Sequence, residues 1–61
     1  MTVVLYDVLR ERSEVIESVT RFEGRLMQIK GGLSNVWVLH LADKSQRAYS
    51  AKNYTILRIE D

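Results

Sequence analysis

The chain has 61 residues, with nine lysines and arginines against eight aspartates and glutamates. This length allows a single domain, residues 1–61, and a net charge of +1 excludes a strongly basic protein that coats duplex DNA. Because there is no cysteine and only one histidine, His40, we expect no disulfide, no metal and no cofactor. A core this small usually needs another source of stability, and we expect a homo-oligomer.

No fully apolar run exceeds four residues, as in Val36–Leu39, so we expect no membrane-spanning segment. The N-terminus shows no pattern typical of a secretory signal. The cytoplasm is therefore the expected compartment.

The first twelve residues allow two interpretations. Val3–Tyr6 is rich in β-branched and aromatic residues, which favours a strand followed by a hairpin loop at Arg10–Ser13. A short N-terminal helix is the alternative, because four apolar residues also fit one helical stripe. These residues are Val4, Leu5, Val8 and Leu9. We favour the strand.

The stretch from Val15 to Ile29 is long for one strand, and we expect it to bend at Gly24, since a glycine within a strand often marks a bulge or a barrel corner. Lys30–Asn35 predicts a turn. Two strands with a period of two are then expected. In Val36–Leu41 one strongly apolar face is formed by Trp37, Leu39 and Leu41, and in Tyr54–Ile59 the residues Thr55, Leu57 and Ile59 oppose the other three.

A shorter strand is expected at Gln46–Ser50. The five predicted strands, the second of them strongly bent, indicate a mainly β fold. We expect a small, partly open antiparallel barrel.

No catalytic constellation is visible, so we expect the chain not to be an enzyme. His40 is the only imidazole that could activate a serine or threonine, and it lies within a predicted strand. The acidic residues of the first half show no sign of converging and fit a solvated strand face. Gly31 and Gly32 connect two strands, which is typical of a hairpin turn and not of a phosphate-binding loop.

Phe22–Ile29 resembles the first motif of the Sm and Sm-like RNA-binding family: an apolar residue, a glycine two positions later, an aliphatic residue after two more and an apolar residue after three more. Asn35 stands where that family has a loop asparagine, and Val36–Leu41 resembles the strand that follows. Lys30 replaces the family's usual loop aspartate, and the loop is about one residue longer.

Ser45–Tyr49 is similar to the fourth strand of the bacterial, Hfq-type branch of this family. The next loop of that branch carries a Lys-His pair. Here Lys52-Asn53 comes later and the histidine is missing. The last strand is also similar, so the resemblance covers residues 22–59.

The resemblance implies a homo-oligomeric ring that binds single-stranded RNA near its central hole. The loops would bring Lys30 and Lys52 together, Asn35 and Asn53 could contact base edges, and Tyr49 could stack on an unpaired base. A small barrel of the Src-homology type that acts as a protein-interaction adaptor remains the alternative, and Tyr49 could equally serve in packing.

Overall fold

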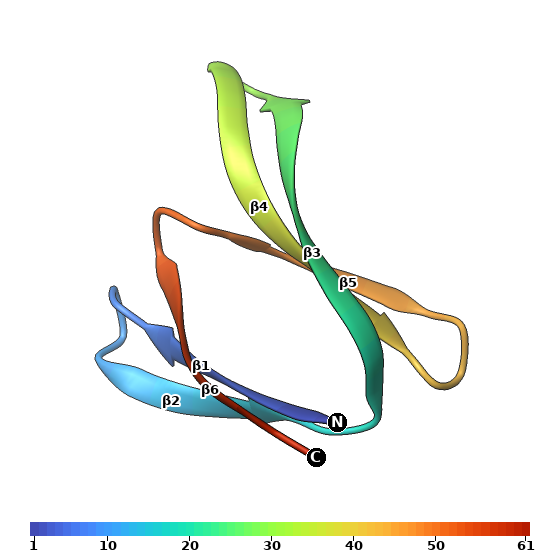
Figure 1. Cartoon of the computed structure of the whole chain (residues 1–61). Coiled ribbons are helices and arrows are strands. Elements are labelled where there is room, and N and C mark those ends of the chain that lie inside the picture. The colour runs from blue at the N-terminus through green and yellow to red at the C-terminus, as the bar shows by residue number, and fades with distance from the viewer.

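The computed structural model describes all residues from Met1 to Asp61 and consists of strands and turns without helices. Six strands form two three-stranded antiparallel sheets (Figure 1). Their bounds are Thr2–Asp7 (β1), Arg12–Ile16 (β2), Val19–Ile29 (β3), Gly32–Leu41 (β4), Gln46–Ser50 (β5) and Tyr54–Glu60 (β6). No helix is present that could cross a membrane. The mainly β prediction is confirmed.

The first sheet has the order β2-β1-β6, with β1 in the centre. The strand interpretation of the N-terminus is therefore confirmed, and the helical alternative is wrong. The turn that follows is stabilised by Asp7, which is 5% exposed and accepts hydrogen bonds at Oδ1 from the backbone N–H groups of Leu9 and Arg10, both 3.1 Å long.

The second sheet has the order β3-β4-β5, with β4 in the centre. Two residues, Lys30 and Gly31, separate the paired ends of β3 and β4, where Ile29 faces Gly32. Because β5 pairs only with Val36–His40, the distal part of the β3–β4 hairpin has two strands. This two-stranded part, residues 25–35, is called the arm here, and it stands clear of the other strands in Figure 1.

The chain passes between the two sheets at residues 17–18, not at Gly24. Ser18 has a φ of 60° there, and Val19 exchanges backbone hydrogen bonds of 2.8 and 2.9 Å with Met1. The long predicted second strand is thus two strands, β2 and β3, and the expected five-stranded barrel is not confirmed: the structure has six strands and no closed barrel.

Gly24 lies inside β3, opposite Trp37 and away from the one irregularity in the β3–β4 pairing. A Cβ atom at this position would lie 3.3 Å from Trp37 Cζ3, which is tighter than ordinary van der Waals contact. The glycine therefore makes room for an indole ring, and the strand pairing has no bulge at this residue.

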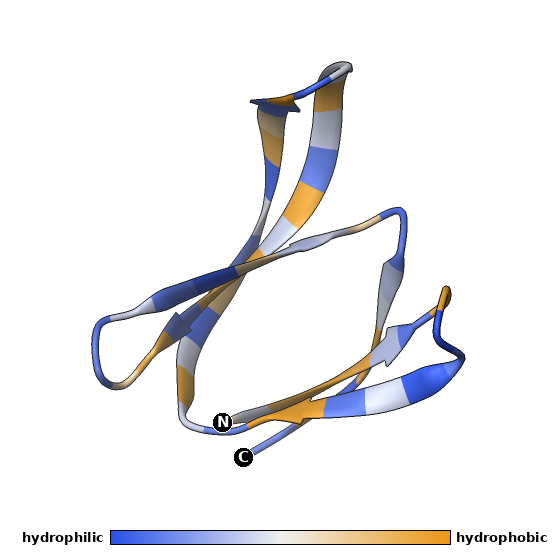
Figure 2. Cartoon of the chain, turned by 180° about the vertical axis from the view of Figure 1, so that it is seen from behind, coloured by the Kyte–Doolittle hydropathy of each residue, from blue (hydrophilic) through white to orange (hydrophobic).

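The core lies where the two sheets meet. Its five buried residues come from both sheets and are Val3, Leu5, Ile16, Val19 and Leu39. Trp37 adds a polar link, because its Nε1–H donates a 3.2 Å hydrogen bond to the backbone oxygen of Tyr54 on β6. Figure 2 shows apolar segments along the strands around this core and also along the arm.

Candidate functional site

Two adjoining hollows, of about 330 and 310 Å³, lie between the arm and the β5–β6 turn. Together they form what we call the arm groove. Its lining residues are Ile29, Lys30, Gly31, Gly32, Leu33, Ser34, Asn35, Ser50, Ala51, Lys52 and Asn53. Four of the five residues proposed from the sequence as RNA contacts are in this set, although they come from segments about twenty positions apart.

The β5–β6 turn is held against β4 and against the first sheet by backbone hydrogen bonds. Ala51 N–H donates to the oxygen of Asn35, and Val8 N–H donates to the oxygen of Asn53, both at 2.9 Å. Asn53 N–H closes the turn on the oxygen of Ser50 at 3.0 Å. The second wall of the arm groove is therefore built from a fixed turn, and Lys52 at its tip has a defined position relative to the arm.

The arm groove is positively charged. Lys30 and Lys52 are both exposed and neither takes part in an ion pair within the chain. No aspartate or glutamate lines the groove. The side-chain amides of Asn35 and Asn53 make no hydrogen bond within the chain. The groove thus offers two ammonium groups and two free amides to a polyanionic ligand with hydrogen-bonding edges.

Tyr49, the fifth residue proposed from the sequence, lies outside the arm groove. Its ring packs edge-on against Tyr54, with ring centroids 4.9 Å apart, and both rings contact the core. The Tyr49 hydroxyl donates a 3.4 Å hydrogen bond to Glu14. Burial raises the pKa of Tyr54 above its ordinary value. The two half-buried rings pack against the core, and neither lines the groove.

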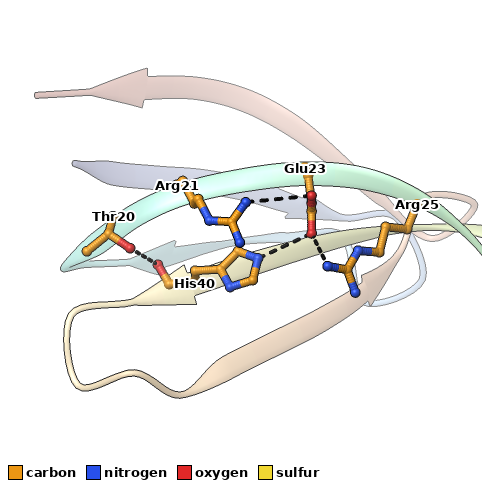
Figure 3. A network of polar contacts seen from close by, with 5 residues as sticks. All are labelled: Thr20, Arg21, Glu23, Arg25 and His40. Carbon is orange, nitrogen blue, oxygen red and sulfur yellow. Dashed lines mark hydrogen bonds and ion pairs between the residues drawn. The ribbon is translucent and has the colours of Figure 1, made fainter.

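A second polar cluster, which the sequence did not indicate, lies on the outer face of β3 and β4 (Figure 3). Glu23 is in contact with Arg21 at 3.8 Å, with Arg25, and with His40 Nε2 at 3.3 Å. The pKa of Glu23 is lowered, most strongly by the hydrogen bond with His40 and to a smaller extent by the positive charges of Arg25 and Arg21. The alternation of side chains along a strand already places Arg21, Glu23 and Arg25 on one face of β3, so this part could be predicted from the sequence. His40 joins them only through the register of β3 against β4.

A third hollow lies at the turn between β1 and β2 and is lined by charged and polar residues only. They are Asp7, Arg10, Arg12, Ser13 and Glu14. Asp7 is already engaged in the turn described above, so its carboxylate has a structural role. No group of three or more histidine, aspartate or glutamate side chains is arranged to hold a metal ion.

Comparisons with protein-family models, curated proteins and solved structures give no match for this chain. The similarity to the Sm-like family, based on motifs in residues 22–59, therefore stays a prediction.

Proposed function

We propose that this chain is a non-catalytic RNA-binding protein of the Sm-like type that acts in the cytoplasm and binds single-stranded RNA in the arm groove. The observation that carries the proposal is the meeting of Lys30, Lys52, Asn35 and Asn53 around one groove without a carboxylate. Ammonium groups are suited to phosphates and free amides to base edges. No cofactor or metal takes part in this function.

A homo-oligomeric ring is the assembly that fits this function. β5 pairs only with β4, and β6 pairs only with β1, so each strand has one edge whose backbone groups need a partner. Head-to-tail pairing of such edges around an axis produces a closed ring. Leu57 and Ile59 on β6 are 52% and 44% exposed, and a neighbour at this edge would cover them. The ring would also multiply a weak groove into linked sites.

Titration of short uridine-rich and adenine-rich RNA oligomers at two salt concentrations tests the proposal. Lys52→Ala removes one ammonium group from every groove, so we expect affinity to fall by more than about fivefold, which corresponds to about 1 kcal/mol. The dependence of binding on salt should also become shallower, by about 0.7 in the log–log slope for each phosphate that the variant no longer neutralises.

The matched control is Lys44→Ala. Lys44 is an exposed lysine in the β4–β5 turn and does not line the arm groove, so its removal should change affinity little. Equal reductions in affinity from both variants would show diffuse electrostatic attraction and refute a groove site.

Exposed apolar side chains favour a second candidate function, a protein-interaction adaptor. Four of the ten exposed large apolar side chains lie on the arm: Leu26 (63% exposed), Met27 (38%), Ile29 (48%) and Leu33 (68%). Clustered apolar exposure of this kind is typical of protein-binding surfaces. Absence of RNA binding by the parent protein at low salt would refute the first proposal in favour of the adaptor.

A further inference from the structure

The backbone hydrogen bonds of β4 define which groups of β3 are free. Leu41 N–H donates to the oxygen of Ser45, and Ala51 N–H donates to the oxygen of Asn35, both at 2.9 Å. The odd-numbered residues of β4 in this stretch therefore direct their backbone groups toward β5. Successive residues of an antiparallel strand alternate between its two edges, so the even-numbered residues bond to β3. These pairs are Val36 with Arg25, Val38 with Glu23 and His40 with Arg21.

It follows that the alternate residues of β3 direct their N–H and C=O groups away from β4. They are Phe22, Gly24, Leu26 and Gln28. β3 is an edge strand of its sheet, and the hydrogen bonds between Met1 and Val19 reach only its first residue. The remaining edge runs along the arm and contains no proline. Such an edge is a template for another strand.

We propose that this free edge of β3 pairs antiparallel with the same edge of a second copy of the chain, with a two-fold axis at Gly24. Gly24 then faces Gly24 of the second copy, and Phe22 faces Leu26 of the second copy on both sides of the axis. The outward backbone groups of all these residues meet one another, as a hydrogen-bonded antiparallel ladder requires. The three-stranded β3-β4-β5 sheets of the two copies then become one continuous sheet.

The charges of β3 select this register. Glu23 of each copy lies directly opposite Arg25 of the other, which gives two opposite-charge pairs across the axis. A shift of two residues in either direction keeps the backbone ladder but centres the pairing on Glu23 or on Arg25. Glu23 or Arg25 at the centre would then face the same residue of the second copy, which places like charges opposite each other. Opposite charges directly across strands stabilise a sheet, and like charges destabilise it.

The exposed apolar side chains of the arm support the same contact. A two-stranded hairpin is marginally stable by itself in water, and Leu26 on the arm is 63% exposed. In the proposed register Leu26 packs beside Phe22 of the second copy, a residue that contacts the core. The arm is then extended by the three-stranded β3-β4-β5 sheet of the second copy. This contact uses β3, whereas the proposed ring would use β5 and β6, so it is independent of RNA binding and of the ring.

Native mass spectrometry of the purified chain, 7.1 kDa per copy, tests the contact through charge exchange. The parent protein should contain an even number of copies. Glu23→Arg and Arg25→Glu each place like charges across the axis, so each variant alone should show half the parent's copy number. An equimolar mixture should restore that number with equal copies of both variants, because each arginine then faces a glutamate.

Three further proteins keep the test decisive if a single variant folds poorly. The double variant Glu23→Arg/Arg25→Glu preserves both pairs and should retain the parent's copy number. Glu11→Lys and Lys44→Glu change the net charge by the same amounts in turns away from β3, and each alone should also retain it. An odd copy number for the parent, a monomer included, would overturn the proposal, and so would single variants that keep the parent's number or a mixture that stays halved.

Discussion

Replacement of Leu39 by alanine is expected to abolish most of the stability of the fold. Leu39 is fully buried and is one of five residues in the core cluster. The substitution removes three carbon atoms, and at about 0.8 kcal/mol for each buried CH₂ the transfer free energy alone is about 2.4 kcal/mol. The cavity left behind raises the destabilisation to about 2–5 kcal/mol. A single core of this size rarely supplies more than about 3–5 kcal/mol in total, so a large fraction of Leu39→Ala should be unfolded at 25 °C.

Urea denaturation followed by the fluorescence of Trp37, the only tryptophan, measures this destabilisation. Leu33→Ala is the matched control, because Leu33 lies on the same strand and is 68% exposed. Its free energy of unfolding should stay within about 0.5 kcal/mol of the parent value. A Leu39→Ala protein with the parent's denaturation midpoint would refute the assignment of the core. Both comparisons need equal protein concentration, because association adds to apparent stability.

Two further predictions concern polar contacts. Asp7→Ala removes the acceptor for two backbone N–H groups in the β1–β2 turn and should lower the free energy of unfolding by about 1–3 kcal/mol. Asp7→Asn keeps an acceptor oxygen and should have a smaller effect. Equal urea midpoints for Asp7→Ala and the parent protein would contradict the role of the carboxylate. Contacts with His40 and two arginines lower the pKa of Glu23 from 4.5, so its stabilisation is fully present above that pH and is lost as the pH falls through the lowered value. As the pH is lowered from about 6 to 3, the urea midpoint of Glu23→Gln should therefore decline less steeply than that of the parent protein. Some decline should remain in the variant, because the hydrogen bond from Ser45 lowers the pKa of Asp43 in the same way.

Most strands could be predicted from the sequence because their causes are local. β4 and β6 are rich in β-branched and aromatic residues, which favour strands, and in β4 every second position from Trp37 to Leu41 is strongly apolar. A turn at the two glycines was likewise predictable, because Gly31 and Gly32 have φ values of 99° and 129°, which glycine adopts without strain. The turn is limited to Lys30-Gly31, however, and the predicted turn at Lys30–Asn35 is wrong for residues 32–35, which belong to β4.

The crossing between sheets at residues 17–18 was not predictable in this way. Ser18 has a positive φ without being a glycine, and its conformation is supported by distant contacts. Ala42 N–H donates a 2.9 Å hydrogen bond to the oxygen of Ser18, and Met1 bonds to Val19. Gly24 carries a strong local signal for a bend, but its neighbour across the sheet is Trp37. The glycine is needed for that packing contact, which no local pattern contains.

The candidate site was likewise predictable only in part from the sequence. The sequence by itself determined the residue types, because Lys30, Lys52 and Asn53 lie in the turns after β3 and β5 and Asn35 lies near the start of β4. Only the tertiary structure decided that Lys30, Asn35, Lys52 and Asn53 line one groove while Tyr49 packs inward. Alternation assigns a side chain to one of two strand faces, but which face is covered depends on the second sheet and on the twist that brings it there. That choice is a property of strands that pair across the chain, and no single stretch of sequence contains it.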